Sequence, residues 1–408
     1  MIVNSYVARQ PILDKKLKIF AYELLFRSEN KGAAYDSPDG DKASVYTTVE
    51  SFYSMGIESI TNKKPAFINF TKMLLLEGVA TLFPKDLLVI EVLEDVEPTE
   101  EVIEACRTLH EAGYVLALDD FVYKPELEPL IKMSRILKFD FIANTTREIS
   151  ETLKKIDVSG KILLAEKIET VEMFKKASKM GFTLFQGYFF CKPVTFSTRR
   201  LETLQITYLS LIKELGEGYD ADFGKLANII RNDMALCHKL LRMVNSVYYS
   251  LLSKVTDIKH ALAILGLREI RKWVYVTSMM ELCSKKPDEL VRTSMIRAFF
   301  MEHVSYSCQL SFLRENLFLL GIFSLIDVIM EKPMELALNG MLLSPAITDA
   351  LIFHKGMMNN FLMLAISIEK GDWDETDRLC LQFGITKEQI SDAYIKAVQW
   401  CDSMLDMS

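Results

Sequence analysis

Tyr114-Val115-Leu116-Ala117-Leu118-Asp119-Asp120-Phe121 is an apolar run that ends in two adjacent carboxylates. A short apolar run that follows a helical pattern and a Gly is typical of a buried parallel strand. Acidic residues at the carboxyl end of such a strand lie where α/β barrels and open sheets bind their ligands. Because an Asp pair also caps loops, the pair alone leaves a ligand site and a loop cap both open.

The first half of the chain alternates short apolar runs with helical patterns. This repeated alternation predicts a parallel sheet, and the number of runs favours a closed, TIM-like (β/α) barrel. The expected helices cover residues 43–56, 99–112, 126–134, 146–155 and 170–180. The expected strands cover residues 6–8, 19–26, 66–70, 87–92, 115–118, 136–139, 162–166 and 184–188.

Strand patterns stop near residue 195, and helical periodicity continues toward the C-terminus. Ser344-Pro345 predicts a helix start, and Thr386-Lys387-Glu388-Gln389 fits a capping box. The expected helices include 201–215, 223–230, 235–247, 258–265, 269–283, 290–310 and 317–330. We therefore expect an α/β plus all-α protein, with a barrel domain over 1–195 and a helical domain over 200–408.

The composition is that of a soluble globular protein, with half of the 408 residues apolar and a quarter charged. The net charge of −7 and the absence of a long basic block argue against nucleic acid as the main partner. The seven cysteines are dispersed without a CxxC pair, which indicates a reducing cytoplasm. Neither a signal peptide pattern at Met1–Tyr6 nor a membrane-spanning stretch is expected, since the longest apolar run is about half a bilayer span.

Polar side chains end or interrupt almost every expected strand of the first half. They are costly beside apolar residues unless they are paired or coordinated. Oxygen-rich sets of this kind suit Mg²⁺ or Mn²⁺, and two such ions on shared carboxylates are suited to phosphodiester cleavage. A nearby Lys adds positive charge for the developing phosphorane. The groups are Glu23, Asn69, Glu91 with Glu94, Asp119 with Asp120, Lys138, Glu166 and Gln186.

Residues 5–193 resemble the EAL family of cyclic di-GMP phosphodiesterases through successive motifs in the family's order. Glu23-Leu24-Leu25 stands where the family has its eponymous Glu-Ala-Leu, and Asp119-Asp120-Phe121 matches the double Asp. The other matching motifs are Arg9-Gln10-Pro11-Ile12, Ile68-Asn69-Phe70-Thr71, Glu91-Val92-Leu93-Glu94, Leu137-Lys138-Phe139-Asp140, Ala165-Glu166-Lys167-Ile168-Glu169 and Phe185-Gln186-Gly187-Tyr188.

The resemblance implies a role for each matching residue. The ligands of a first Mg²⁺ or Mn²⁺ ion would be Glu23, Asn69, Glu91 and Asp119. Asp119 and Asp120 would reach a second ion, with Glu166 close to it. Lys138 would orient the attacking water, and Glu166 is the candidate base. The residues that would contact or line the substrate site are Gln10, Arg27 and Gln186.

The chain departs from the EAL pattern at positions that bear on turnover. The family follows its double Asp with a Gly-containing, Ser-rich loop, whereas this chain has Phe121-Val122-Tyr123-Lys124-Pro125-Glu126. That stretch has no Gly to permit a positive φ, and Pro125 restrains Lys124. Lys167 replaces a small residue after Glu166. Because a misplacement of about 1 Å costs roughly a hundredfold in rate, these departures leave turnover open.

The second half resembles the HDOD family, a non-enzymatic relative of the HD phosphohydrolases that serves as a signalling output. The matching segments are Leu240-Leu241-Arg242-Met243-Val244-Asn245-Ser246 and Ala263-Ile264-Leu265-Gly266. The sequence has no His-Asp dipeptide, and its histidines lack the spacing of metal ligands. We expect His238, His260, His303 and His354 to be surface or packed residues, and Asn245 to hydrogen-bond a helix end or loop.

The two resemblances together predict a bacterial, cytoplasmic EAL–HDOD signalling protein. The barrel is expected to bind cyclic di-GMP, with weak hydrolysis left open, and the helical half to act on a protein partner. One alternative is an active Mg²⁺- or Mn²⁺-dependent phosphodiesterase that yields pGpG. Another is a protein-interaction scaffold that ignores nucleotide. The sequence leaves the protein partner and the oligomeric state open, a homodimer included.

Overall fold

The computed structural model describes residues 5–28, 57–188, 223–245, 255–282, 287–339, 341 and 343–406. Contacts within the chain divide it into two compact units, one of residues 1–192 with 366–395 and one of residues 193–365 with 396–408. The predicted boundary at 195–200 and the expected helices at 43–56 and 201–215 lie outside the described residues. The domain ranges 1–195 and 200–408 therefore stay a prediction.

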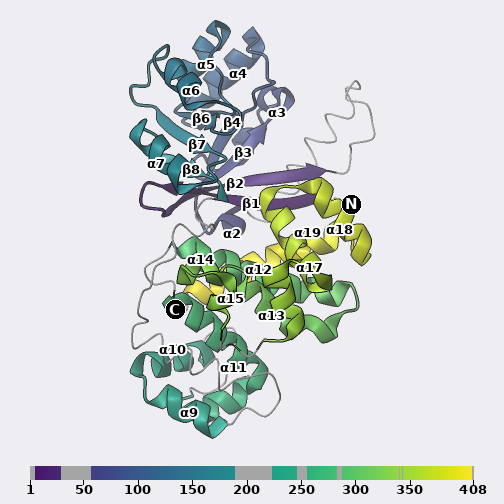
Figure 1. Ribbon diagram of the computed structural model, residues 1–408. Coiled ribbons are helices and arrows are strands. Elements are labelled where there is room, and N and C mark those ends of the chain that lie inside the picture. The colour runs from purple at the N-terminus through teal and green to yellow at the C-terminus, as the bar shows by residue number, and fades with distance from the viewer. Residues whose placement is uncertain are drawn as a thin grey trace. The chain divides into compact units, whose positions relative to one another are not determined.

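The first unit contains a closed barrel of eight strands in sequence order, as predicted (Figure 1). The strands are β1 (Ser5–Asp14), β2 (Ile19–Ser28), β3 (Ala66–Phe70), β4 (Leu88–Val92), β5 (Val115–Leu118), β6 (Ile136–Asp140), β7 (Ile162–Glu166) and β8 (Leu184–Gln186). Neighbours from β2 to β8 are parallel, whereas β1 is antiparallel to both β2 and β8. The expectation of a wholly parallel sheet is thus wrong for β1, because the turn between Asp14 and Ile19 is too short for a crossover.

Four helices of the first half lie where the periodicity predicts them, with ends shifted by at most two residues. They are α4 (Glu100–Glu111), α5 (Glu128–Met133), α6 (Thr146–Leu153) and α7 (Val171–Lys179). The side chain of Thr99 accepts a hydrogen bond from Val102 N and caps α4, as its position before two acids indicates. The sequence patterns missed α2 (Ile57–Thr61) and α3 (Lys72–Leu76), which have five residues each and are too short to show a period.

The barrel core is a ring to which each strand contributes one buried side chain. Its members are Ile12, Ala21, Phe67, Val89, Ala117, Ile136, Leu164 and Leu184. All eight are at most 5% exposed. Every strand buries one side chain at this level, so the eight residues fill this layer of the barrel interior. Other residues form the next layer toward the ends of the strands.

The second half is helical in all described segments. The helices are α9 (Phe223–Arg231), α10 (Met234–Val244), α11 (Ile258–Leu282), α12 (Asp288–Ser307), α13 (Arg314–Phe323), α14 (Ile326–Met330), α15 (Met334–Ala337), α16 (Pro345–Phe353), α17 (Gly356–Lys370), α18 (Trp373–Phe383) and α19 (Lys387–Asp406). Gly266 has φ 70° within α11 and separates the two helices expected at 258–265 and 269–283. The single helix expected over 317–330 is wrong, since the chain breaks at Ser324-Leu325 between α13 and α14.

Helices of the second unit are joined by buried ion pairs and by one close backbone contact. Glu302 of α12 is 1% exposed and lies 2.7 Å from both Arg268 Nη2 and Lys272 Nζ of α11. A Cβ atom on Gly321 of α13 would lie 2.2 Å from the backbone N of Ala298 of α12. Such a distance leaves room only for Gly, so α12 and α13 meet backbone to backbone.

Among the described residues, no single helix has the length and apolar character of a membrane span. Only α16 and α17 taken together have them, and these two helices are bent by 53° relative to each other.

Candidate metal and nucleotide site

A ring of polar side chains lies directly above the apolar ring of the barrel. Each polar residue stands two positions from its strand's core residue, so the two share the face that points into the barrel. The polar residue comes later in the chain in β2 to β8 and earlier in β1, which runs in the opposite direction. The polar ring therefore lies at the carboxyl end of the parallel strands, where barrels bind ligands. Its members are Gln10, Glu23, Asn69, Glu91, Asp119, Lys138, Glu166 and Gln186.

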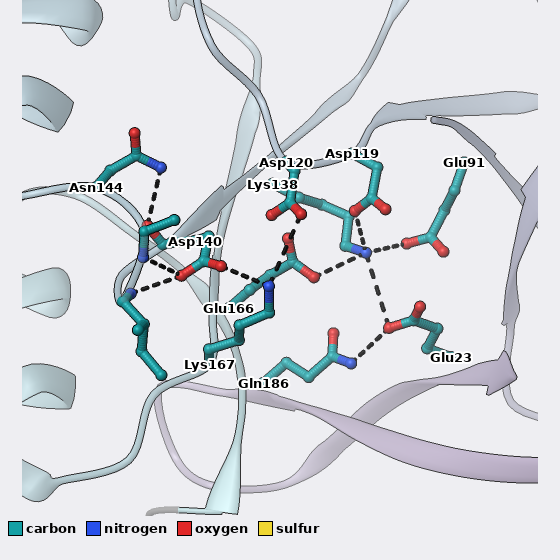
Figure 2. A network of polar contacts seen from close by, with 12 residues as sticks. Glu23, Glu91, Asp119, Asp120, Lys138, Asp140, Asn144, Glu166, Lys167 and Gln186 are labelled. Atoms are coloured by element: carbon teal, nitrogen blue, oxygen red, sulfur yellow. Dashed lines mark hydrogen bonds and ion pairs between the residues drawn. The ribbon is translucent and has the colours of Figure 1, made fainter. Parts of the chain in front are cut away.

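Lys138 lies at the centre of the polar ring (Figure 2). Its side chain is fully buried, and Nζ is 2.6 Å from Glu91 Oε1 and 2.7 Å from Asp119 Oδ1. Glu166 Oε1 lies 2.9 Å from the same Nζ, and Glu23 Oε2 lies 3.8 Å from it. The fold thus gathers residues from five strands that the sequence predicted as metal ligands and catalytic groups.

The four carboxylates carry more negative charge than one ammonium group can balance. Burial raises the pKa of the Glu91 carboxyl well above its ordinary value, although Lys138 opposes this shift. Burial also raises the pKa of Glu166 to about 8, against the same opposing charge. Burial alone would lower the pKa of Lys138, but the surrounding carboxylates outweigh it and raise that pKa. The site therefore favours proton or cation uptake.

The donor set fits a hard divalent cation. Within the described part of the chain, no three acidic, His or Cys side chains already surround one open point, because the Lys138 ammonium occupies the centre of the carboxylates. Several buried oxygens nevertheless have no hydrogen-bond partner there. These are Asn69 Oδ1, Glu91 Oε2, Asp120 Oδ1 and Glu166 Oε2. Buried acceptors without donors are costly, and carboxylate and amide oxygens are the ligands that Mg²⁺ and Mn²⁺ prefer.

Asp120 takes part in a second cluster beside the ring, with two residues to which the sequence assigned no role. Lys167 Nζ lies 2.5 Å from Asp140 Oδ2 and 3.8 Å from Asp120 Oδ2. Figure 2 shows the three side chains next to Glu166. Burial raises the pKa of the Asp120 carboxyl, although the Lys167 charge opposes the shift. The replacement of a small residue by Lys167 was the sequence signal that could have found this cluster.

The predicted substrate contacts fall into two groups. Gln186 Nε2 donates to Glu23 Oε2 at 2.5 Å and to Gln10 Oε1 at 2.8 Å, so both glutamines lie in the polar ring. Gln10 Nε2 donates in turn to the carbonyl of Glu369, which belongs to the same compact unit. No sequence signal links Gln10 to a residue so distant along the chain. Arg27 lies on β2, and its side chain is outside the described part of the structure.

The stretch after the double Asp is anchored at both ends. The Phe121 side chain is 3% exposed and contacts Phe139 edge to face, and its N–H donates to the carbonyl of Lys138. Lys124 has φ −133° and ψ 140°, the extended conformation that a following Pro imposes, and Pro125 begins a short 3-10 helix (Pro125–Leu127). Positive φ occurs at Asp120 but at none of residues 121–126. The stretch is therefore a defined turn without the conformational freedom of a Gly-containing loop.

The histidines of the helical half lie on surfaces or in packing contacts, as predicted. His238, His260 and His354 are exposed, and His303 stacks on Phe299 with ring centroids 4.0 Å apart. Among the described residues they form no metal-ligand group. Asn245 is also confirmed as a structural residue. Its side chain donates to the carbonyls of Leu241 and Val255 and accepts from Val255 N, with distances of 2.7 to 2.8 Å.

The closed barrel with a carboxylate ring around a buried Lys, followed by helices, agrees with the barrel and helical HDOD architecture that the sequence predicts. The HDOD domain family matches residues 201–336. YuxH of Bacillus subtilis, a protein described as uncharacterized, is 35% identical over 99% of this chain and 100% of its own length. The cyclic di-GMP phosphodiesterase CdgJ of Vibrio cholerae is 33% identical over 97% of this chain and 92% of its own length.

The chain belongs to the family of these two relatives and carries an HDOD domain in its second half. Among solved structures, the calcium and cyclic di-GMP complex of Klebsiella pneumoniae BlrP1 is 22% identical to it. That match covers 45% of this chain and 54% of the other, with a TM-score of 0.38.

Proposed function

We propose that this chain is a cyclic di-GMP signalling protein whose barrel binds the nucleotide together with Mg²⁺ or Mn²⁺. The observation that carries the proposal is the polar ring, in which every strand delivers one oxygen- or nitrogen-bearing side chain and Lys138 lies among four carboxylates. The family relationship to CdgJ, whose name gives cyclic di-GMP as its substrate, supports the choice of nucleotide.

In this proposal the barrel also hydrolyses cyclic di-GMP slowly to linear pGpG. A water oxygen forms a bond to one phosphorus, and the bond from that phosphorus to the ribose 3′ oxygen breaks. Glu166 would accept a proton of the water and pass a proton to the leaving oxygen, and Lys138, whose Nζ lies 2.9 Å from Glu166 Oε1, would orient the water. Bound divalent ions supply activation of the water and stabilisation of charge on the phosphate oxygens.

The ligand roles are those that the resemblance to the EAL family implies. Glu23, Asn69, Glu91 and Asp119 would hold the first ion, since they come from four consecutive strands, β2 to β5. Asp119 and Asp120 would reach the second. Gln10 and Gln186 would line the nucleotide pocket next to Glu23, and Arg27 would contact a phosphate.

A second candidate is a receptor that binds cyclic di-GMP without turnover. The turn at residues 121–127 favours it, because the buried Phe121 and the extended Lys124 fix this segment in a shape of its own. Binding tolerates a displaced group better than catalysis does, since a shift of about 1 Å is enough to reduce a rate roughly a hundredfold.

The experiment is a paired binding and turnover assay on the purified full chain. Labelled cyclic di-GMP is added with Mn²⁺, with Mg²⁺ or with a chelator, and pGpG is followed by chromatography. Glu23→Ala and Lys138→Met are expected to abolish product, while the matched control Glu172→Gln, an exposed carboxylate on α7, leaves it unchanged. Product from the wild-type chain supports hydrolysis, and binding without product supports the receptor. Absence of binding contradicts both and leaves a nucleotide-independent scaffold.

We further propose that residues 1–195 form the barrel domain and residues 200–408 the helical domain, which the HDOD match at 201–336 supports. The helical domain would act on a protein partner. The dispersed cysteines support a cytoplasmic location, since none of the five in the described residues forms a disulfide.

A further inference from the structure

Asp120, Asp140 and Lys167 come from the ends of three consecutive strands. Asp140 is the last residue of β6, Asp120 is the second residue after β5, and Lys167 directly follows β7. The three side chains meet beside the polar ring, next to the carboxylate of Glu166 (Figure 2). They form a second charged cluster, distinct from the one around Lys138.

Two members of this cluster have a backbone that their residue type rarely adopts. Asp120 has φ 38° and Lys167 has φ 52°, both in the left-handed region. Each stands one position after a polar-ring residue, so a regular strand would turn its side chain out of the barrel. With this left-handed backbone at both positions, the side chains of Asp120 and Lys167 lie near each other instead. For a Lys, which lacks the conformational freedom of Gly, this backbone is favourable only where its contacts stabilise it.

Asp140 is the group that fixes the Lys167 ammonium. Its Oδ1 accepts hydrogen bonds from the backbone N–H groups of Ile142 at 2.6 Å and Ala143 at 2.8 Å. Its Oδ2 accepts from Lys167 Nζ at 2.5 Å. With the carboxylate held from both sides, Lys167 Nζ is placed 3.8 Å from Asp120 Oδ2.

The two carboxylate oxygens of Asp120 therefore have different surroundings. Its Oδ2 faces the Lys167 ammonium, while its Oδ1 is buried and has no hydrogen-bond partner among the described residues. A buried carboxylate oxygen without a donor is a coordination position for a cation. Any cation at that position would lie within a few ångströms of a fixed positive charge, and like charges at that separation repel.

We propose that Lys167 is a positioning residue that supplies a resident positive charge at the second metal position. The barrel then holds one divalent ion firmly and a second one only weakly. This inference rests on the proposed function, because it assumes that the polar ring takes a divalent ion. It identifies the replacement of a small residue by Lys167 as a determinant of ion occupancy.

The test measures Mn²⁺ binding to the full chain by titration calorimetry, and the coupling between bound ions by electron paramagnetic resonance. Lys167→Met keeps the length of the side chain and removes the charge, Lys167→Gly also relieves the backbone, and Lys167→Arg keeps the charge. In the Met and Gly variants the second Mn²⁺ is expected to bind about 10- to 100-fold more tightly than in the wild-type chain. A spectrum of two coupled Mn²⁺ ions should appear in these variants at two equivalents, and not in Lys167→Arg.

Lys63 offers a matched control outside the site. It is exposed, has φ 58°, and lies between α2 and β3. Lys63→Met and Lys63→Gly change the same charge and the same backbone type, so they are expected to leave Mn²⁺ binding as in the wild-type chain. A gain in second-ion affinity in these variants would assign the effect to net charge alone and overturn the proposal.

Two further outcomes also overturn it. One is a wild-type chain that binds two Mn²⁺ ions as tightly as Lys167→Met does. The other is a complete lack of Mn²⁺ binding in every variant. In either case the cyclic di-GMP binding assay decides separately about the proposed function. Retained nucleotide binding means that only the role of Lys167 was wrong.

Discussion

Lys138 Nζ lies 2.6 Å from Glu91 Oε1, and both side chains are completely buried. The pair connects β6 to β4, its second neighbour in the sheet, with β5 between them. A buried charge pair is weak evidence for stability in itself, but the loss of one partner leaves the other charge uncompensated. Here the loss of the Lys138 ammonium would leave four neighbouring carboxylates without that positive counter-charge.

Lys138→Met is therefore expected to reduce the free energy of unfolding of the barrel by about 3–5 kcal/mol at pH 7 without divalent ions. Urea denaturation followed by circular dichroism measures the change. Lys175→Met on the exposed side of α7 is the control and should cost less than about 0.5 kcal/mol. Added Mn²⁺ should stabilise the Lys138→Met chain more than the wild-type chain, because the vacated carboxylates bind cations. Equal stability of variant and wild type would contradict the charge-balance account.

The raised pKa of the Glu166 carboxyl predicts how the stability of the metal-free protein changes with pH. Its pKa in the folded chain is about 8, above the ordinary value of 4.5, so the folded state binds more protons than the unfolded state between these values. Stability should then be fully present below about pH 4.5 and fall as the pH rises toward 8, by up to about 5 kcal/mol. Denaturation midpoints across this range measure the slope. Glu166→Gln should reduce this slope and leave the part that comes from Glu91, whereas Glu172→Gln should not change it.

Gly187→Ala is expected to disrupt the closure of the barrel next to β8. A Cβ atom there would lie 2.2 Å from the carbonyl oxygen of Ile168, and the backbone has φ 141°. Gly160→Ala is the matched control, since Gly160 also has a positive φ, 74°, but has open space around the added atom. The control should cost about 1 kcal/mol and Gly187→Ala at least about 2 kcal/mol more. Similar costs in a denaturation series would show that the contact with Ile168 is unimportant.

The hydrogen bonds of the Asn245 side chain predict that its substitution weakens a local contact in the helical half. Its amide NH₂ group donates to two carbonyls, and its oxygen accepts from Val255 N. Asn245→Ala removes the acceptor of the Val255 N–H and both donors, so the connection should weaken by about 1–3 kcal/mol. Faster hydrogen exchange at Val255, measured by mass spectrometry, is the expected sign. The exposed Asn232→Ala serves as the control, and equal exchange in both variants would count against the structural role of Asn245.

The sequence predicted the strands and the polar ring because both follow local patterns. A buried parallel strand reads as an apolar run, and a residue two positions beyond the core residue shares its face. Val89 and Glu91 illustrate this, since the first lies in the apolar ring and the second in the polar ring. The antiparallel direction of β1 could also have been inferred from the short turn before Ile19.

The sequence could not predict contacts that depend on unusual backbone conformations or on distant segments. Residues 120 and 167 adopt positive φ where Lys167 meets Asp120 and Asp140. Asp adopts this backbone more often than most residues, but a Lys gives no sign of it. The hydrogen bond from Gln10 to the carbonyl of Glu369 joins two residues far apart in the chain, and the sequence around either residue does not indicate the other. The break between α13 and α14 likewise interrupts an apolar stretch that reads as one helix.

The contact between Gly321 and Ala298 has a mechanical consequence. No layer of side chains separates α12 from α13 at this point, since even a methyl group on residue 321 would overlap the backbone of α12. Side-chain layers are what allow packed helices to slide past each other in small steps. Without such a layer, the two helices cannot slide or roll against each other at this point, and they move together as one rigid body. A signal that passes through this part of the helical half must move both helices together.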